Sequence, residues 1–593
     1  MSSYLAGRIK KPTTYKILTP SNGQNVKPRF VIGFDSEADT SSQGKPMLFQ
    51  FSLPGASEED TLCVEIAETR HAGLKALLTF LDTYCTSRDY QYLIYCWNLG
   101  YELTQIFHDL PNEQRKQDQL FLTPQSASGD RVYDWKIEVV NNKRQMVKFR
   151  RGKNIAVSFY DGMAFYNTSL DKAAKMLGLG SKYESDTVDR TLFTREDLND
   201  PEFIKYAKRD AYITRRIGEY IASQHTALGI PTTISAPHLA STVFKTNYLS
   251  GVINPPSEPL EQAGLYAYHG GKNGFYLSGP HDFADIWDYD ITSAYPEAMR
   301  QLPNLDRYRW RYVTTYSEGR HGLYLVSGRY NRCKWRGLQE HDGSWASAGT
   351  IQPGIWTTSY ELDVMVSKNE FTIDSCVGYE MDGASGGPLA RYVDDFFAIK
   401  SNTTGPERET AKLLLNSLYG KFFQKQPIGS VGTFDLDSKR WIITDPSADY
   451  DYEAGGLYHP PIAALVTGYV RARIHGLEHK YDAVMTSTDG FFGFVPPDIT
   501  DLGSGLGQLK AVRGRLRIWR ERMYIFDGND GKRLCALHGF RGSIKDLESM
   551  PLASGEYWYQ GKQMITLKMS NSKHNGVYYE PGTFVTLPYK ITI

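Results

Sequence analysis

The sequence of 593 residues has little cysteine and no net charge, and each shortage excludes a simple class of protein. Its six cysteines are scattered without a C-x-x-C pair, so neither a disulfide framework nor a zinc ribbon is expected. The 67 basic residues are balanced by 67 acidic ones. This balance excludes a histone-like protein that binds phosphate through its overall charge, but it allows a local basic groove.

Targeting segments, long apolar runs and zinc motifs are missing as well. The first residues, MSSYLAGRIKKPTTYKIL, have no apolar signal-peptide core. The longest apolar stretch, PPIAALVTGYV at 460–470, is too short to span a bilayer. Neither H-E-x-x-H nor a paired spacing stands out among the 13 histidines, so no zinc site is expected. The sequence predicts a cytosolic protein without membrane contact.

The composition that remains is ordinary for globular proteins, with 41% apolar and 23% charged residues. A chain of this length exceeds one compact core, so several domains are expected. Strand-like and helical patterns are mixed, which predicts an α/β and α+β multidomain fold. The stretch 226–260 carries repeated prolines and few periodic apolar positions, so we interpret it as a domain junction.

Hydrophobic periodicity places the elements that carry the motifs. Apolar runs predict strands at 30–35 and 92–97, and WDYDITSAY at 287–295 is also strand-like; the first run ends in a carboxylate and the last segment contains one. Helices and a hairpin are predicted at 202–225, 407–423, 463–481 and 483–495.

A first group of carboxylates begins at the end of the first predicted strand. Asp35 and Glu37 are two residues apart, so both side chains lie on one face of the strand. Two such carboxylates repel each other unless a divalent cation such as Mg²⁺ or Mn²⁺ neutralises them. Tyr206 and Asp210 share one face of a predicted helix. Each pair alone is more often a solvated surface feature.

Taken in order, D-x-E, N-x-x-Y-E and Y-x-x-x-D closely resemble the three motifs of the DEDD-type 3′–5′ exonuclease domain. The resemblance implies an RNase H-like domain in which Asp35, Glu37 and Asp210 hold two metals and Tyr206 orients the attacking water. The single-stranded end would contact Asn98, Tyr101, Ser169 and Leu170. Glu102 stands where the family usually has Asp, which moves the carboxylate by about 1.5 Å. We therefore expect slowed hydrolysis, which Glu102→Asp should maintain or raise.

A second group follows the junction. Asp290 ends a strand, Asp489 occupies a predicted hairpin turn, and Lys412, Asn416 and Tyr419 form one stripe of a predicted helix. A polar stripe with a basic head and an aromatic end is unusual for a core face. Each segment alone is also compatible with a purely structural role. Their order along the chain and their residue identities together favour a shared function.

These pieces resemble motifs A, B and C of family B DNA polymerases, with Ala294, Ser487 and Gly490 as departures. The resemblance implies that Asp290 and Asp489 bind two Mg²⁺ ions, for which Mn²⁺ is expected to substitute, and that the Ile291 carbonyl joins them. Lys412 would neutralise triphosphate charge. Tyr295 would reject a 2′-hydroxyl, which makes the substrates deoxynucleoside triphosphates. Asn416 and Tyr419 would check the nascent pair.

Three further segments resemble the protein-primed branch of this family, found in phages and linear plasmids. Y-H-G-G at 268–271 matches the Y-x-G-G motif through Tyr268, Gly270 and Gly271, which would contact DNA. R-E-R-M-Y resembles the K-x-Y segment, with Arg522 and Tyr524 near the primer terminus. Lys400 would bind triphosphate. Both spacings between motifs leave room for the branch's two insertions.

The resemblance implies that a right-hand polymerase, with palm, fingers and thumb, follows the exonuclease domain in the chain. The predicted segments are exonuclease 1–225, junction and first palm 226–300, first insertion 301–387, fingers 388–423, second insertion 424–458, second palm 459–537 and thumb 538–593. The expected partners are template and primer DNA, nucleotides and a terminal protein primer, and the chain is expected to be a monomer in the host cytosol.

Other functions stay open. One is a family B polymerase that is self-priming or starts on a nucleic-acid primer. Another is a metal-dependent exonuclease whose second half is a DNA clamp, and a third is a silent replication scaffold.

Overall fold

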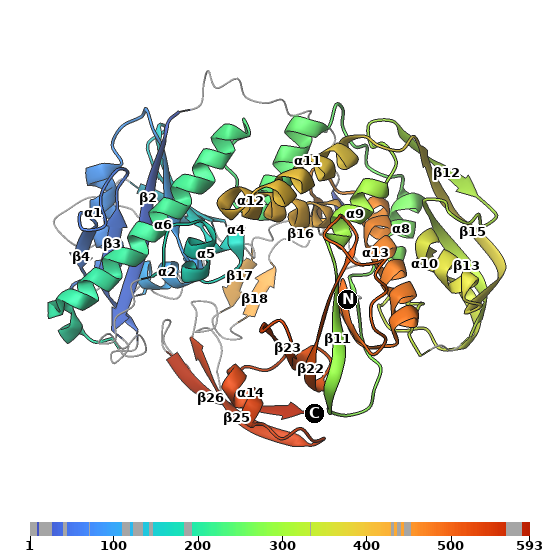
Figure 1. The fold of residues 1–593 in the computed structure, drawn as a ribbon. Coiled ribbons are helices and arrows are strands. Elements are labelled where there is room, and N and C mark those ends of the chain that lie inside the picture. Colours follow the sequence, from blue (N-terminus) through green and yellow to red (C-terminus); the bar gives the residue numbers. More distant parts are fainter. Residues whose placement is uncertain are drawn as a thin grey trace.

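The structure is a computed structural model, drawn in Figure 1. The residues that it describes are 9–10, 27–39, 44–69, 71–108, 119–121, 135–140, 146–182, 193–331, 334–427, 432–435, 440–443, 452–564 and 584–593. The sheet that contains β2, β3 and β4 lies at one end of the molecule, and the sheet that contains β12, β13 and β15 lies at the other (Figure 1). Between them lie the helices α11 (Pro388–Asn402), α12 (Gly405–Ser417) and α13 (Pro460–Tyr481).

The first half of the chain builds an eight-stranded sheet, the N-terminal sheet, with the order β4-β3-β2-β5-β9-β8-β7-β6. Its strands are β2 (Arg29–Asp39), β3 (Lys45–Ser52), β4 (Leu62–Glu65), β5 (Gln91–Cys96), β6 (Gln119–Phe121), β7 (Trp135–Val140), β8 (Met146–Arg151) and β9 (Ile155–Asp161). β2, β5 and β9 run parallel, and the outer pairings are antiparallel. The first two predicted strands are confirmed as β2 and β5.

The long helix α6 (Pro201–Ala227) lies against β2, as Figure 1 shows. The two elements approach closely because Gly33 of β2 has no side chain. A Cβ at Gly33 would lie 2.1 Å from the carbonyl oxygen of Ala211. Asp200 caps the helix, and Pro201 stands in its first turn, where no N–H donor is needed. This close approach carries Asp210 to the strand that bears Asp35.

Shorter helices complete the first half. They are α1 (Ala72–Tyr84), α2 (Leu99–Ile106), α4 (Met163–Tyr166), α5 (Leu170–Met176) and the 3₁₀ helix η2 (Arg195–Asn199).

The proline-bearing stretch between the halves contains more regular structure than its sequence pattern indicates. It forms α7 (Ala236–Val243), the π-helix η3 (Phe244–Tyr248) and α8 (Glu258–Ala267). Pro237 and Pro259 lie in the first turns of α7 and α8, where proline is compatible with a helix. Prolines that suggest a loop are therefore helix starts here.

A seven-stranded antiparallel sheet, the central sheet, interleaves two distant parts of the chain in the order β10-β20-β21-β11-β22-β23-β24. Its strands are β10 (Lys272–Phe275), β11 (His281–Ile291), β20 (Ala483–Thr488), β21 (Gly490–Gly493), β22 (Leu509–Arg520), β23 (Met523–Gly528) and β24 (Arg533–Leu537). The predicted hairpin is confirmed as β20 and β21, with Asp489 between them. The helix α9 (Ala294–Gln301) follows β11.

A separate four-stranded sheet has the order β12-β15-β13-β14, and all of it lies within the predicted first insertion. It consists of β12 (Tyr308–Val313), β13 (Gly322–Tyr330), β14 (Gly349–Thr358) and β15 (Phe371–Gly383), with α10 (Ser359–Ser367) between the last two in sequence. α10 packs on α13. This insertion is thereby joined to the central part of the molecule.

The remaining elements are short. They are β1 (Ile9–Lys10), β16 (Lys425–Pro427), β17 (Gly432–Asp435), β18 (Arg440–Ile443), β19 (Tyr452–Ala454), the 3₁₀ helix η4 (Tyr419–Phe423), α14 (Ile544–Ser549), β25 (Glu556–Met564) and β26 (Phe584–Thr592). Much of the predicted second insertion lies outside the described residues, and all the predicted domain boundaries stay predictions.

One hydrophobic core crosses the junction between the halves. It includes Val31 and Leu93 of the N-terminal sheet, Tyr289 of the central sheet and Leu415 of α12. Burial of such side chains is the main source of stability, so the halves stabilise each other. Within the described ranges, no helix has the length and apolar character that crossing a membrane requires.

Candidate active sites

The second predicted group of residues comes together around one cavity of about 520 Å³, called here the central cavity. Its lining residues are Asp290, Ile291, Ser293, Ala294, Tyr295, Pro296, Lys400, Arg408, Glu409, Lys412, Asn416, Tyr419, Asp489 and Lys510. Eight of these were predicted from sequence motifs that lie up to 200 residues apart. Folding therefore unites motifs A, B and C and the additional lysine.

Backbone pairing sets the positions of the two aspartates. Asp290 is near the end of β11, and Asp489 lies in the turn between β20 and β21. The backbone N–H of Ile291 donates to the carbonyl oxygen of Asp489 at 3.0 Å, which fixes the two strands at this point. The hydroxyl of Thr488 donates to Oδ1 of Asp489 at 2.8 Å. The sheet thus presents both carboxylates to the same cavity.

Positive charge surrounds these carboxylates. Burial and the neighbouring Asp489 raise the pKa of Asp290, while Lys510, Lys400 and Lys412 oppose that rise. Burial, together with Lys510, Arg408 and Lys412, lowers the pKa of Lys400 to about 8. The central cavity is therefore suited to a ligand that brings both divalent cations and several negative charges.

The aromatic and polar residues of the cavity are arranged by α9, α11 and α12. The rings of Tyr295 and Tyr419 stack at 4.3 Å with an angle of 5° between their planes. Nζ of Lys400 donates to the hydroxyl of Ser293 at 2.6 Å, and Lys412 lies 3.9 Å from Glu409. The α-helix ends at Ser417, so Tyr419 belongs to η4 rather than to the predicted continuous helical stripe.

Sequence reasoning missed two cations of this cavity. Arg408 lies one helical turn before Lys412 on α12, and that spacing could have revealed it. Lys510 lies on β22 directly opposite Asp290 of β11. No local pattern could have indicated Lys510, because only the strand register brings it to the aspartates.

The Y-H-G-G segment, residues 268–271, lies directly behind the cavity. The ring of Tyr268 stacks on Phe423 at 3.7 Å. A Cβ at Gly271 would lie 2.8 Å from both the Tyr295 hydroxyl and Cγ2 of Thr488, whereas a Cβ at Gly270 would meet nothing within 4 Å. Gly271 is therefore required by close packing against Tyr295, and Gly270 is not.

The predicted K-x-Y equivalent forms the connection from β22 to β23. Arg522 has a left-handed backbone with φ of 56°, and the ring of Tyr524 meets Phe492 edge-on at 5.1 Å. Burial and Asp288 raise the pKa of Tyr524 to about 12. Asp288 is two residues before Asp290, so Tyr524 lies near the carboxylate strand. Contact of Arg522 and Tyr524 with a primer stays a prediction.

The first predicted group forms a second acidic site, the N-terminal acid cluster, made of Asp35, Glu37, Glu102 and Asp210. Burial and the charge of Asp210 raise the pKa of Asp35 to about 8, and burial with both aspartates raises the pKa of Glu37. Burial and Asp35 likewise raise the pKa of Glu102. Folding therefore brings all four predicted acids within electrostatic reach of one another.

Glu102 is held in place by Ser36, the residue of β2 that lies between Asp35 and Glu37. Its side chain is 1% exposed, and the hydroxyl of Ser36 donates to its Oε2 at 2.5 Å. This contact uses the longer glutamate side chain. The extra methylene that distinguishes Glu102 from the usual aspartate is thus accommodated by a specific partner.

Lys182 is a member of this site that the sequence did not indicate. Its Nζ forms an ion pair with Asp210 and lies 5.4 Å from the ring centre of Tyr206. Burial alone would lower its pKa, but Asp210, Asp35 and Glu37 outweigh burial and raise it. Lys182 therefore stays charged among the acids. It lies on a connection after α5 without a motif that we could recognise.

The predicted single-strand ligands have local structural contacts. Asn98 is exposed and its backbone N–H donates to Asp161 at 3.1 Å, while burial and the acids Glu37, Glu102 and Asp35 raise the pKa of Tyr101. Ser169 caps α5, and Leu170 is buried in the core. Burial leaves Leu170 little surface for a strand. Strand binding by these residues stays a prediction.

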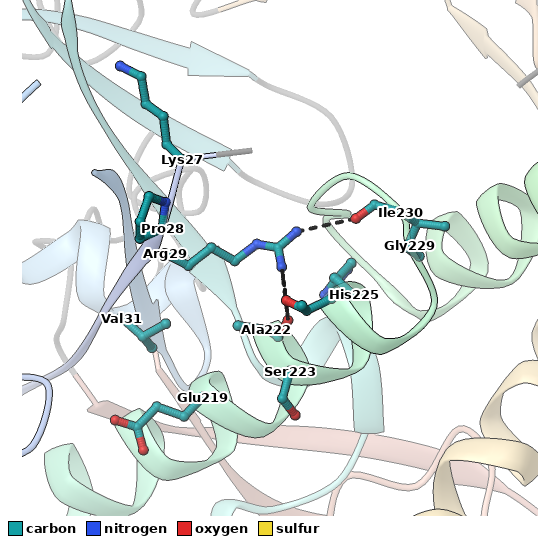
Figure 2. Close-up of a pocket in the computed structure, with 11 residues that line it drawn as sticks. Lys27, Pro28, Arg29, Val31, Glu219, Ala222, Ser223, His225, Gly229 and Ile230 are labelled. Carbon is teal, nitrogen blue, oxygen red and sulfur yellow. Dashed lines mark hydrogen bonds between the residues drawn. The ribbon is translucent and has the colours of Figure 1, made fainter. Parts of the chain in front are cut away.

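A further cavity of about 420 Å³ lies beside the start of β2 (Figure 2). The guanidinium of Arg29 donates to the carbonyl oxygens of Ala222 and Ile230 at 3.1 and 3.2 Å, as Figure 2 shows, and to the hydroxyl of Thr226 at 2.6 Å. His225 is engaged by Ile221 and Thr233. The polar groups of this cavity are used to fasten β2 to the end of α6, so it is a structural junction.

The donor sets of both acidic sites fit divalent metals that prefer oxygen. The central cavity has the two carboxylates of Asp290 and Asp489, and the N-terminal acid cluster has four carboxylates. Burial and a neighbouring aspartate raise the pKa of Asp35 and of Asp290, so added positive charge would favour the charged form of each. Mg²⁺ or Mn²⁺ would supply that charge.

Comparisons with known proteins agree with this geometry. Residues 184–428 match the family described as DNA polymerase type B, organellar and viral. A probable DNA polymerase of Podospora anserina is 23% identical over 292 residues, covering 46% of this chain and 23% of that protein. Another from Agaricus bitorquis is 27% identical over 214 residues, covering 34% and 26%. The matches thus span about a quarter of these curated relatives.

The whole fold is similar to that of phi29 DNA polymerase. The structure of that enzyme with primer-template DNA and incoming nucleotides matches with a TM-score of 0.68 and 15% identity, covering 96% of this chain and 99% of that one. Its orthorhombic crystal form matches with a TM-score of 0.67 and 16% identity, covering 95% and 100%. The predicted multidomain α/β and α+β architecture is confirmed. The family match over residues 184–428 and the similarity of the whole fold both agree with the resemblance to family B DNA polymerases.

Proposed function

We propose that this protein is a DNA-directed DNA polymerase that copies a template by a two-metal mechanism. The observation that carries the proposal is the central cavity, where both aspartates, three lysines, an arginine and two stacked tyrosines line a single space. The fold that it shares with phi29 polymerase supports the same conclusion, since that enzyme is seen with primer-template DNA and nucleotides. A DNA clamp would not need so many cations around two carboxylates.

Most of the predicted residues of the cavity bind metal or nucleotide in this mechanism. Asp290 and Asp489 would hold two Mg²⁺ ions, with the Ile291 carbonyl beside them. Bound there, the metals would activate the primer 3′-oxygen and stabilise the departing pyrophosphate. Lys400, Arg408 and Lys412 orient and neutralise the triphosphate from α11 and α12. Asn416 and Tyr419 check the new base pair.

Tyr295 would select the sugar. It stacks on Tyr419, and Gly271 packs behind its hydroxyl, so the ring has little room to retreat. A 2′-hydroxyl would meet this ring, which would favour deoxynucleotides. Tyr295→Val should admit ribonucleotides while deoxynucleotide incorporation stays measurable.

Primer extension with Mg²⁺ on a long single-stranded template tests the polymerase proposal. We expect full-length product from the unaltered protein and none from Asp489→Asn, which keeps the side-chain shape but removes a metal-binding charge. Mn²⁺ should replace Mg²⁺. Extension by Asp489→Asn at the rate of the unaltered protein would contradict the assignment.

We further propose that the N-terminal acid cluster removes nucleotides from single-stranded 3′ ends. Three buried acids and the half-buried Asp35, with one charged lysine and a neighbouring tyrosine, support a two-metal hydrolytic site. The variant Asp35→Asn plus Glu37→Gln should lose excision but still extend primers. Full excision by this variant would contradict the proposal, and loss of both activities would point to misfolding.

We also propose that synthesis starts on the hydroxyl of a terminal protein. Support comes from the Y-H-G-G segment beside the cavity and from the insertion 301–387, which forms its own sheet. Incubation with labelled deoxynucleotide and proteins encoded nearby should yield a labelled band that protease removes and nuclease does not. Labelled DNA without attached protein would favour self-priming or nucleic-acid primers instead.

The remaining expectations complete this proposal. The protein would act as a monomer in the cytosol of a host cell that carries a phage or a linear plasmid. Sedimentation of the purified chain with and without primed DNA would test its oligomeric state.

A further inference from the structure

A buried group of two histidines and a glutamate lies between α13 and the turn that precedes β15. His475 and His479 are four residues apart on this helix, so they share one face. Glu370 comes from the turn between α10 and β15 and points to the same place. Glu370 and His475 are 5% and 3% exposed. The group joins the insertion 301–387 to the central part of the molecule.

The prediction that the chain has no zinc site leaves out the pair His475 and His479, whose spacing of four residues is itself a paired histidine spacing. The third ligand is more than 100 residues away in sequence, so spacing alone could not have completed the set.

We propose that Glu370, His475 and His479 form a site for one transition-metal dication of the zinc class. Their ligand atoms all lie within 4.8 Å of one another. Nε2 of His475 is 2.7 Å from Oε2 of Glu370, and Nε2 of His479 is 2.7 Å from Oε1 of the same carboxylate. Two imidazoles and one carboxylate suit Zn²⁺ and leave one coordination position for water.

The surroundings of His475 can orient it for a metal. Its Nδ1 is 3.4 Å from Oε2 of Glu478 and 2.7 Å from Nζ of Lys272. Without metal, Lys272 donates to Nδ1, and the opposite Nε2–H donates to Glu370. With metal, Nδ1–H would donate to Glu478, Lys272 would keep its ion pair with Glu478, and Nε2 would be available as a ligand. Metal binding would therefore need a change of tautomer in the ring.

Two buried cations beside this group have carboxylate partners of their own, since Lys272 pairs with Glu478 and Arg471 pairs with Glu361. The two oxygens of the Glu370 carboxylate instead face the two histidines, one oxygen to each ring.

The order His475-x-x-Glu478-His479 also occurs in metallopeptidases, where the glutamate is a general base. Glu478 does not fit that role here. It is fully buried and accepts hydrogen bonds from Lys272, from Tyr276 at 2.6 Å and from Thr486 at 2.6 Å. We therefore assign the metal a structural role, fastening the turn before β15 to α13. This assignment does not depend on the proposed polymerase activity.

Co²⁺ is the probe for this site, because Co²⁺ with nitrogen ligands in a tetrahedral site absorbs visible light far more strongly than Co²⁺ on octahedral carboxylate sites. The full-length chain is stripped with a chelator and titrated with Co²⁺, then with Zn²⁺. We expect strong absorption that saturates at one equivalent and is lost when Zn²⁺ is added. The absorption should be retained in His538→Ala, a matched control at an exposed histidine of the described chain.

Substitutions of the proposed metal ligands test whether the absorption comes from this site. His479→Ala and Glu370→Gln should abolish the absorption, and Zn²⁺ should raise the melting midpoint of the unaltered chain but not of these variants. His479→Cys should keep binding and add a thiolate-to-metal charge-transfer band. No strong absorption in the unaltered chain, or the same absorption in His479→Ala, would overturn the proposal. Primer extension in Mg²⁺ measures polymerase activity separately, so failure of either proposal can be distinguished.

Discussion

The central cavity and the N-terminal acid cluster both gather carboxylates, but they differ in the positive charge around them. The cavity is lined by Lys400, Arg408, Lys412 and Lys510, which oppose the rise in the pKa of Asp290 or lie beside it. In the part of the chain that is described, the acid cluster has Lys182 among its four acids. Burial and the neighbouring Asp210 raise the pKa of Asp35 to about 8, although Lys182 opposes this rise.

This difference follows from what each site would bind. A nucleoside triphosphate brings several charges into the cavity, so cations on two helices and one strand are useful there. The 3′ end of a single-stranded DNA would bring one phosphodiester to the acid cluster. A single lysine close to the acids is then enough to balance its charge. We therefore expect the two sites to respond differently to the loss of one cation.

The strongest contrast should come from Lys182→Met and Lys412→Met. Removal of Lys182 should lower excision by about 10²- to 10³-fold, as loss of one preorganised charge partner does in other active sites. Excision of labelled single strands measures this change. Lys412→Met should lower primer extension much less, because three cations remain in the cavity. Equal losses in the two variants would break the comparison.

The glycines of the Y-H-G-G segment offer a matched pair of variants. Gly271→Ala should lower the kcat/KM for nucleotide incorporation by about 10²-fold, since its Cβ displaces Tyr295 or Thr488 next to Asp489. Gly270→Ala should have little effect, because its Cβ meets nothing within 4 Å. Single-nucleotide incorporation kinetics will measure both, and excision should be unchanged in each.

Glu102→Asp tests how well the acid cluster is fitted to its unusual residue. The sequence alone predicts that aspartate maintains or raises excision. The hydrogen bond from Ser36 to Glu102 leads us to expect the opposite, a fall of about tenfold, because aspartate is too short to keep that partner. Excision kinetics decide between them, and a rise in rate would show that the contact does not position Glu102.

The smallest expected effect is a pH dependence of nucleotide use. Lys400 has a pKa lowered to about 8, so it is charged below that pH and neutral above it. Between pH 7 and pH 9 the kcat/KM for nucleotide should therefore fall by up to about tenfold. Lys400→Arg keeps its charge over this range and should not show the fall. A fall of the same size in Lys400→Arg would assign it to another group.

Local sequence patterns predicted much of both sites. The strands β2 and β5, the helix α6 and the hairpin of β20 and β21 were all recognisable, because apolar periodicity and turn residues act over short distances. The motifs identified eight residues of the central cavity and four acids of the second site. Such residues are recognisable because their chemistry needs particular side chains at particular spacings.

By itself, the sequence determined which acids, tyrosines and lysines are available and on which elements they lie. Only the tertiary structure brought in Lys510, through the register of β22 against β11, and Lys182, on a connection without a motif. It also decided that Gly33 lets α6 reach β2, and that Glu370 meets His475 and His479. The physical reason is that strand register, close backbone approach and long-range side-chain contacts are set by packing between segments, which no local pattern encodes.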